Sequence, residues 1–318
     1  MKITTILNKD YLYSNSYKTI SEFRPADESL YLYGYSTEDR SLLVNTLTAD
    51  ISLSNVVFVE IESPEKDVII DKKTGEKYFL RSSKSIKSLY ETYSAKTIYI
   101  DVSGLNNRIS ASLLKNALEI ANTSVRVVYT EPEHYDIEKF KEEGVLCKDL
   151  SERIEGIEPL PGLANIIPDD VDMKFVALLG FEGGRFTQMY ETVQPPIDKI
   201  IPVIGVPGYR PEYPFVAYWG NRRPLIYTES WQFVEYAAAN SLVDVFFLLQ
   251  KIKKKPPVSK IKLAPIGTKP HAIGAILFAI KYPTDVEIVF DNPIRKSKRT
   301  KGVGLIVESK VSELLHES

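Results

Sequence analysis

The sequence of 318 residues predicts an α/β protein of two Rossmann-like lobes with mostly parallel sheets. Three observations lead to this prediction. Short β-rich segments alternate with helical segments of about ten residues, a pattern typical of parallel sheets that helices cover on both faces. Glycine-bearing turns directly follow several strands, at the strand ends where such sheets bind ligands. Glycines, prolines and charges interrupt all periodicity between residues 135 and 168, which indicates a boundary between lobes.

The first lobe is predicted to begin with a β-α-β unit. Residues 29–35 and 55–61 have the composition of strands, and residues 36–47 between them have helical spacing. Gly75 indicates a hairpin turn, because glycine adopts the positive φ that such turns need. The remaining elements are the hairpin strands 68–70 and 78–80, a helix over 86–93, a strand over 97–102, a helix over 109–121 and a strand over 125–129.

The second lobe is predicted to repeat this alternation. Its strands are expected over 174–179, 199–205, 261–265 and 285–290, with an edge strand over 304–308. Its helices are expected over 185–191, 231–249 and 272–280. The basic run 251–255 follows the longest helix, where cations suit a helix C-terminus. A boundary near residue 150 gives an N-terminal lobe over 1–150 and a C-terminal lobe over 151–318, which carries the candidate ligand site.

The composition narrows the classes of function. The chain has 40 Lys and Arg against 42 Asp and Glu, so no overall field would hold it on nucleic acid or an anionic membrane. A single cysteine, Cys147, and three histidines far apart in the sequence argue against a zinc or cysteine-cluster site. No apolar run is long enough to span a bilayer. We therefore expect a cytoplasmic protein without membrane association, and the many tyrosines are typical of an AT-rich bacterial genome.

Three strand-to-helix turns of the second lobe form the candidate ligand site, over residues 180–185, 205–210 and 265–271. Turns at the same ends of parallel strands converge, glycine lets a ligand approach the backbone, and the N–H groups of a helix N-terminus favour phosphate or carboxylate. A basic loop that contains Arg295 adds a local positive patch. The residues expected to bind the ligand are Gly183, Gly184, Arg185, Gly208, Gly267, Thr268, Lys269 and Arg295.

These features also have purely structural interpretations. Glycine after a strand is a common way into a helix whatever the protein binds, and a basic loop is often only solvated surface. The P-loop pattern and the dinucleotide pattern Gly-x-Gly-x-x-Gly are both missing. Glu182, Asp101 and His271 are the candidate acids or bases. A strand-terminal carboxylate such as Asp101 often only caps its turn, and His271 has no obvious carboxylate partner in the sequence.

The segment Leu263-Ala-Pro-Ile-Gly-Thr-Lys-Pro-His-Ala-Ile-Gly-Ala275 resembles the ligand-facing strand, Gly-Thr-Lys turn and helix of CARF domains, the CRISPR-associated Rossmann-fold nucleotide sensors. This resemblance implies that Gly267, Thr268 and Lys269 contact the phosphates of a cyclic or linear oligonucleotide signal. The chain differs from such families in having Ile266 before Gly267, where they often carry two glycines. It also has no recognisable effector nuclease or DNA-binding domain.

Three functions remain open from the sequence. The favoured hypothesis is a protein that binds or senses a nucleotide-like anion, in bacterial antiphage defence, and passes that state to a protein partner. The first alternative is an enzyme that acts on a phosphorylated or nucleoside substrate. The second alternative is an interaction subunit of a larger complex that binds no small ligand. The sequence identifies no cofactor and leaves a homodimer open.

Overall fold

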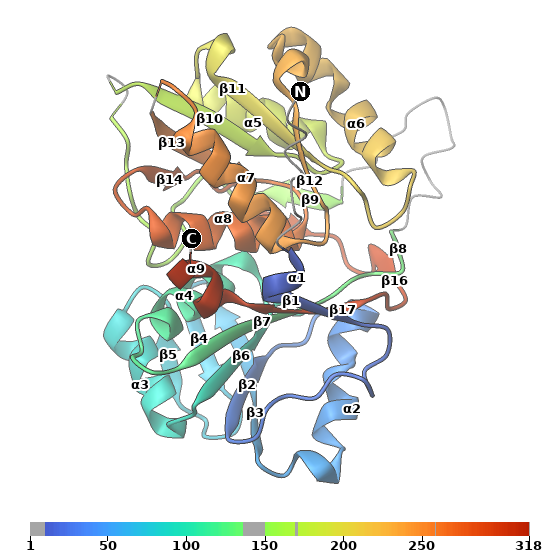
Figure 1. Ribbon diagram of the computed structural model, residues 1–318, viewed down its shortest axis with the longest axis vertical. Helices are drawn as coiled ribbons and strands as arrows, with labels where there is room; N and C mark the ends of the chain where they lie inside the picture. Colours follow the sequence, from blue (N-terminus) through green and yellow to red (C-terminus); the bar gives the residue numbers. More distant parts are fainter. Residues whose placement is uncertain (1–9, 136–149, 169–170, 258, 318) are drawn as a thin grey trace, which may run out of the picture.

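The computed structural model describes residues 10–135, 150–168, 171–257 and 259–317 of the protein. The chain forms a mixed α/β structure with two large sheets, one above the other in the view of Figure 1. The predicted α/β class with parallel strands is confirmed at this level. Within the described ranges, every helix is too short or too polar to cross a lipid bilayer.

The first sheet has eight strands in the order β1-β17-β7-β6-β2-β3-β4-β5. Its four central strands, β7, β6, β2 and β3, run parallel, and antiparallel strands lie at both ends. The strands are β1 (Ser14–Tyr17), β2 (Ser29–Tyr33), β3 (Val56–Glu65), β4 (Val68–Asp71), β5 (Lys77–Phe79), β6 (Thr97–Asp101), β7 (Ser124–Thr130) and β17 (Ile306–Lys310).

Helices cover both faces of this first sheet. Leu30 and Leu32 of β2 pack in one apolar cluster with α3 (Ser83–Tyr93) and α4 (Asn107–Leu118). Tyr31 and Tyr33 point to the other face and pack with α2 (Val44–Thr48), which follows the 3-10 turn η1 (Asp39–Leu42). All of β2 is therefore buried, because alternate side chains of a strand face opposite layers.

The second sheet has five strands, all parallel, in the order β12-β11-β10-β13-β14. Phe186 of α5 and Leu225 of α6 pack on one face against Phe175, whereas Phe246 of α7 and Ile276 of α8 belong to the apolar cluster on the other face. The elements are β10 (Met173–Leu178), α5 (Gly183–Val193), β11 (Ile200–Gly205), α6 (Tyr213–Tyr227), β12 (Glu235–Ala237), α7 (Leu242–Lys254), β13 (Lys260–Pro265), α8 (Lys269–Lys281) and β14 (Val286–Ile288).

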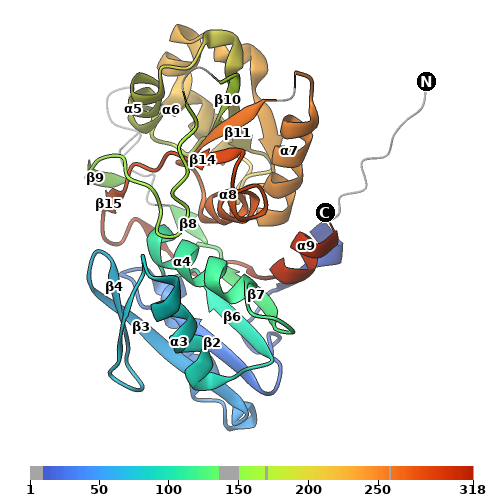
Figure 2. The ribbon, with the colours of Figure 1, turned by 90° about the vertical axis from the view of Figure 1, so that its left-hand side faces the viewer.

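The two lobes meet where α4 of the first contacts α8 of the second (Figure 2). One apolar cluster continues through both lobes at this contact. Two short antiparallel ribbons also join the lobes' connecting segments: β8 (His134–Tyr135) pairs with β16 (Thr300–Lys301), and β9 (Ser151–Ile154) pairs with β15 (Pro293–Arg295). The short helices α1 (Asp10–Tyr13) and α9 (Val311–Glu317) lie in contact beside the first sheet.

The C-terminal strand differs from the sequence prediction. Residues 304–308 were expected as an edge strand of the second lobe, but β17 lies between β1 and β7 of the first sheet. Glu308 is buried there, and its carboxylate accepts from Arg126 at 2.6 Å and from Tyr17 at 2.9 Å. The chain thus returns to the first lobe after completing the second, which a single boundary at residue 150 does not describe.

The predicted helix over residues 231–249 is correct only in its second half. Residues 230–233 form a 3-10 turn, η5 (Ser230–Phe233), and β12 then pairs with β11 before α7 begins. The turn ends at Val234, whose extended backbone (φ −63°, ψ 126°) leads directly into β12. The helix instead starts after Ser241, whose hydroxyl accepts from the backbone N–H of Asp244 at 2.9 Å. Helix α6 was not predicted, because its aromatic sequence has no amphipathic period.

Candidate ligand-binding site

The strand order of the second sheet reverses between β10 and β13, because β11 and β12 lie on one side of β10 and the later strands on the other. The loops after these two neighbours contain Gly180 and Gly267. A Cβ added to Gly180 would lie 3.3 Å from the Cα of Gly267, so the two turns pass in backbone contact. Ligands of open α/β sheets bind beyond the carboxyl ends of the strands at such a reversal.

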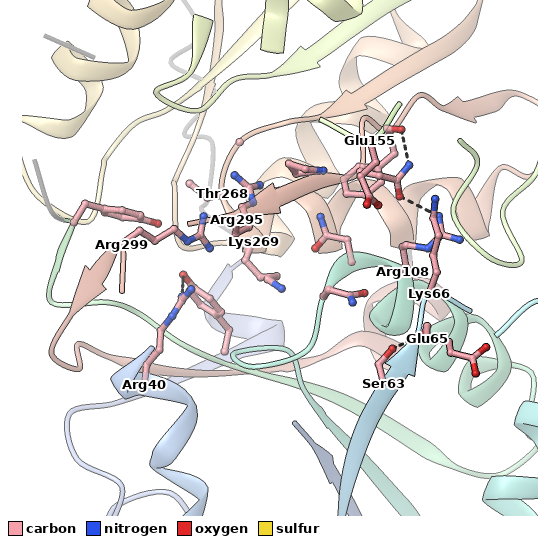
Figure 3. A pocket seen from close by; sticks show the side chains of 18 of the residues that line it. Arg40, Ser63, Glu65, Lys66, Arg108, Glu155, Thr268, Lys269, Arg295 and Arg299 are labelled. Atoms are coloured by element: carbon pink, nitrogen blue, oxygen red, sulfur yellow. Dashed lines mark hydrogen bonds between the residues drawn. The ribbon is translucent and has the colours of Figure 1, made fainter. Parts of the chain in front are cut away.

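A cavity of about 450 Å³ lies beside these turns, between the two lobes (Figure 3). Its volume is within the range of about 300–1,000 Å³ that is usual for small-molecule sites. Both lobes and the segments that connect them line it, with Arg40, Ser63, Pro64, Glu65, Lys66, Asn106, Asn107, Arg108, Tyr129, Tyr135, Glu155, Gly267, Thr268, Lys269, Phe290, Asn292, Pro293, Arg295 and Arg299.

Four cationic side chains gather at one end of this cavity: Arg40, Lys269, Arg295 and Arg299, here named the cation cluster (Figure 3). Arg40 comes from η1 of the first lobe, and Lys269 is the first residue of α8. Arg295 ends β15, and Arg299 precedes β16. Segments that are distant in the sequence therefore bring positive charge to one place.

Two carboxylates contact the cation cluster. Glu38 accepts from Nε of Arg40 and from Nε of Arg299, each at 2.7 Å. Burial favours the neutral form of Glu38, but the two guanidinium groups outweigh this effect and lower the pKa of its carboxyl to about 2. Glu182 accepts from Nη1 of Arg295 at 3.2 Å. Four cationic groups thus face two carboxylates, and the cluster keeps an excess of positive charge.

Lys269 is the member of the cluster that contacts no carboxylate in the described part of the chain. Its Nζ donates to the backbone carbonyl of Leu105 in the first lobe. Burial, and then the positive charges of Arg40, Arg299 and Arg295, lower the pKa of this amine to about 7. The charge of an anion in the cavity would offset the three guanidinium groups and favour the charged ammonium.

A smaller pocket of about 60 Å³ adjoins the cavity at the carboxyl ends of the second sheet. Phe181, Tyr213 and Gly208 line this pocket, and the two aromatic rings pack edge to face with their centroids 5.5 Å apart. The volume of this pocket is several times smaller than that of the cavity. The space for a ligand body therefore lies in the larger cavity.

The opposite end of the cavity is lined by hydroxyl and carboxylate groups and by two paired cations. Asn106 and Asn107, at the N-terminus of α4, directly follow Leu105, whose carbonyl accepts from Lys269, so these two asparagines lie between the cation cluster and this end. Two cations at this end are each paired: Lys66 contacts Glu158 at 2.8 Å, and Arg108 contacts Asp67. Figure 3 shows Ser63, Glu65, Lys66, Arg108 and Glu155 on the side away from the cation cluster.

The structure brings together one part of the residue set expected from the sequence. Gly267, Thr268, Lys269 and Arg295 line the cavity, and Gly208 lines the adjoining small pocket. Thr268 caps α8, since its hydroxyl accepts from the backbone N–H of His271 and donates to the carbonyl of Ala239.

Gly183, Gly184 and Arg185 line neither cavity. Gly183 lets α5 approach α6, because a Cβ there would lie 2.1 Å from the backbone oxygen of Gly220. Arg185 is buried and bound to Asp291 by two hydrogen bonds of 2.6 and 2.7 Å. Its remaining nitrogen donates to Ile266, so this arginine supports the turn that carries Gly267.

The three candidate acids or bases lie in different environments. Glu182 lines the small pocket, where it is held by Arg295 and by the backbone N–H of Ser151 at 2.8 Å. Asp101 lines neither cavity, and burial raises its pKa despite hydrogen bonds from Ser103 and Tyr31.

His271 is fully buried, and its Nε2 lies 3.0 Å from the carbonyl oxygen of Ala238. Burial lowers its pKa, which favours the neutral ring. It lines neither cavity, so it packs within the second lobe.

Sequence reasoning did not find Arg40, Tyr129 or Tyr135. Arg40 donates to the hydroxyl of Tyr129 at 2.7 Å across a separation of 89 residues. Glu38, its neighbour in the sequence, in turn accepts from Arg299 across a separation of 261 residues. Nothing local distinguishes Arg40 from a surface arginine, because both partners are brought in by the fold.

Among the described residues, no group of three or more His, Cys, Asp or Glu side chains is arranged to hold a metal ion. Comparison with models of known families finds no match to this chain. Comparison with curated proteins finds no significant match either. The chemistry of the cavity itself therefore has to indicate its ligand.

Proposed function

We propose that the protein binds a nucleotide-like anionic ligand in the cavity between its lobes and acts as a sensor of that ligand. The observation that carries this proposal is the cation cluster. Lys269 is partly buried among three guanidinium groups and has no carboxylate contact in the described residues. Such a grouping is costly without a counter-charge, because burial and like charges both oppose ionisation.

The backbone at the cluster supports an anionic ligand independently of the side chains. Helix α8 has 13 residues and begins at Lys269, after the capping Thr268. The helix dipole favours negative charge at this end. Pro270 has no N–H, and the N–H of His271 is bound to Thr268, so the backbone contribution comes from the dipole and from the N–H of Lys269. Phosphate and carboxylate are the anions that fit guanidinium donors best.

We further propose that both lobes are Rossmann-like. Numbered within the second lobe, the order β12-β11-β10-β13-β14 becomes 3-2-1-4-5, which is the order of dinucleotide-binding Rossmann sheets. The parallel strands β3, β2, β6 and β7 of the first lobe have the order 2-1-3-4, as in flavodoxin-like sheets. Both orders support a ligand at the carboxyl ends of the strands.

The resemblance of residues 263–275 to CARF domains supports a signalling nucleotide as the ligand. In this proposal the protein works in the bacterial cytoplasm, in defence against phage, and transmits the bound state to a protein partner. Because Arg40 belongs to the first lobe and Lys269 to the second, one anion between them would draw on both lobes at once.

An enzyme acting on a phosphorylated or nucleoside substrate is less well supported. Asp101 and His271 line neither cavity, and Glu182 is engaged by Arg295 and Ser151. A general base needs hydrogen-bond reach to the proton that it removes. Binding without turnover therefore fits the arrangement better.

An interaction subunit is the second candidate function, because α6 and η5 expose an aromatic surface. The side chains of Phe215, Trp219, Ile226, Tyr227 and Trp231 are between 41% and 75% exposed. Arg222 stacks on Trp219 at 4.3 Å, and Arg223 is exposed beside it. The surface suits a protein partner with apolar and acidic side chains. Sedimentation of the purified chain at several concentrations would show whether a second copy takes that place.

Thermal unfolding with a ligand panel tests the anion-binding proposal. Wild type and Lys269→Ala are compared with mononucleotides, NAD, phosphoribosyl pyrophosphate, and cyclic and linear oligonucleotides. A ligand at 100 times its Kd stabilises the native state by about 2.7 kcal/mol. We expect an increase in the midpoint for wild type that is lost in the variant. Chromatography of the recovered ligand should show no conversion.

Two results would contradict the proposal. An unchanged midpoint with every anion would leave the interaction subunit as the better explanation. Conversion of a bound compound that stops in Glu182→Gln would favour the enzyme. Lys84→Met serves as a control, because Lys84 is exposed on α3, outside the lining of both cavities.

A further inference from the structure

We infer that the cavity is built for one nucleotide unit with a terminal phosphate monoester, whose phosphate lies at the cation cluster and whose nucleoside lies against Asn107 and extends towards the other end. This inference rests on the proposed anion-binding function and narrows its ligand class. Three features of the cavity lead to it: the net charge of the cluster, the character of the opposite end, and the volume.

The charge of the cluster matches a dianion. With Lys269 protonated, the four cationic groups exceed the contacting carboxylates Glu38 and Glu182 by two charges. A phosphate monoester carries close to two negative charges at pH 7, because its second pKa is about 6. A phosphodiester group, whether internal or cyclic, carries one negative charge, so it would compensate only half of the excess positive charge of the cluster.

The opposite end of the cavity does not favour a second phosphate. Lys66 and Arg108 are already bound to carboxylates, and Glu65 and Glu155 line the same end. Added negative charge would be repelled there, whereas neutral donors and acceptors would be accepted. The ligand is therefore charged at one end and polar but neutral at the other.

Asn107 provides a specific contact for that neutral part. Its Oδ1 is buried at the cavity wall and has no hydrogen-bond partner in the described residues. A buried acceptor without a partner costs free energy that a ligand hydroxyl or amino group would recover after a small side-chain rotation. Ribose hydroxyls and exocyclic base amines are such donors.

The volume agrees with one nucleotide rather than a ring of several. About 450 Å³ lies in the lower half of the usual range of about 300–1,000 Å³ for small-molecule sites. The adjoining pocket adds only about 60 Å³. For a longer linear oligonucleotide, the cavity would hold the terminal nucleotide, and the rest of the chain would lie outside it.

Titration calorimetry at pH 7.5 and constant ionic strength tests the inference. The probes are inorganic phosphate, the four nucleoside 5′-monophosphates, the methyl phosphodiester of the tightest of them, tripolyphosphate, and a cyclic dinucleotide. We expect one monophosphate to bind at least about tenfold more tightly than inorganic phosphate and than its own methyl ester.

Two variants separate the contacts of the nucleoside from those of the phosphate. Asn107→Ala should weaken the monophosphate about two- to tenfold, the usual worth of one hydrogen bond, and leave inorganic phosphate unchanged. Arg299→Gln should weaken both. Unfolding midpoints without ligand, equal to that of wild type within a few degrees, show that each variant is folded.

The outcomes distinguish this inference from the proposed function. If inorganic phosphate binds as tightly as every monophosphate, the nucleoside part has no subsite and the inference is wrong, although anion binding stands. Tighter binding of the methyl ester or the cyclic dinucleotide would overturn the terminal phosphate. If no probe binds, including tripolyphosphate, the anion-binding function itself fails.

Discussion

Arg185 and Asp291 form a bidentate ion pair with almost no exposure to solvent. Nε and Nη2 of Arg185 donate to the two carboxylate oxygens at 2.6 and 2.7 Å. The side chains are 3% and 0% exposed. The pair joins the start of α5 to the segment after β14, and it holds the Ile266 carbonyl at the turn beside the cavity. The arginine that the sequence offered as a ligand contact is therefore a support for the site.

Removing one partner of this pair should strongly destabilise the protein. Asp291→Ala leaves a buried guanidinium without its counter-charge, and breaking buried pairs in this way costs about 3–5 kcal/mol of unfolding free energy. The double variant Arg185→Met with Asp291→Leu should lose less, because no buried charge remains. Urea unfolding of wild type, Asp291→Ala and the double variant measures these differences in unfolding free energy. Glu62→Ala, which breaks the exposed pair with Lys72, should leave the midpoint unchanged; equal losses for Glu62→Ala and Asp291→Ala would contradict the argument.

The local sequence was sufficient to predict most strands of both sheets and the Thr268 and Lys269 turn. Strand composition and the glycines after strands are local signals, and they do not depend on what packs against them. The direction in which Arg185 points was not predictable, because a carboxylate 106 residues away decides it. The return of β17 to the first sheet depends in the same way on pairing with β7, far back in the sequence.

The adjacent glycines of α5 should respond oppositely to alanine. A Cβ on Gly183 would lie 2.1 Å from the Gly220 backbone oxygen, so Gly183→Ala has to separate α5 from α6 and should destabilise the protein by about 1–3 kcal/mol. Gly184 has open space around its Cβ position and an ordinary helical φ. Gly184→Ala should therefore be neutral or stabilise by up to about 1 kcal/mol.

Urea unfolding of the two alanine variants checks this difference, and ligand binding adds a second readout. If Gly184→Ala abolished binding of the ligand while leaving stability intact, the original expectation of a ligand contact at Gly184 would regain support. Unchanged binding would agree with its position outside both cavities.

Lys269 should destabilise the folded protein at low pH. Its pKa is about 7 in the folded state against 10.5 for an ordinary lysine. Below pH 7 both states hold the proton, and the folded state carries the full cost of the partly buried ammonium. Between pH 7 and 10.5 the unfolded chain binds more protons, so the stability of wild type rises with pH relative to a variant without the amine.

Lys269→Met should therefore be more stable than wild type at pH 6, by an amount of at most about 4–5 kcal/mol from the size of the shift. The difference should shrink towards pH 10. Thermal unfolding in buffers without phosphate or sulfate measures it, and Lys84→Met on the surface of α3 should show no such pH-dependent gain. A constant difference between the variants across this range would show that Lys269 is not desolvated.

Lys269 and Arg295 were expected at the ligand site, but the part of Arg40 in the cation cluster could not be predicted from the sequence. Arg295 and Arg299 lie in a basic loop that the sequence marked as a positive patch, but Arg40 belongs to a different lobe. These arginines come together only because the chain passes from the first lobe to the second and returns. Glu38 then binds both Arg40 and Arg299. Charge convergence of this kind is a property of the tertiary structure alone.

Anion binding should weaken as the pH rises above 7, and the arginine variant should remove this dependence. Phosphate is a dianion between pH 7 and 9. Burial and the charges of Arg185 and Arg299 lower the pKa of Arg295 to about 9, which is still well above that of Lys269, so Lys269 is the first member of the cluster to lose its proton. Its loss should lower wild-type affinity for the tightest phosphate ligand by up to about tenfold per pH unit. Lys269→Arg keeps its charge, and its Kd measured by calorimetry should vary little from pH 7 to 8. A wild-type affinity that is equally flat would mean that the anion lies beyond the reach of Lys269.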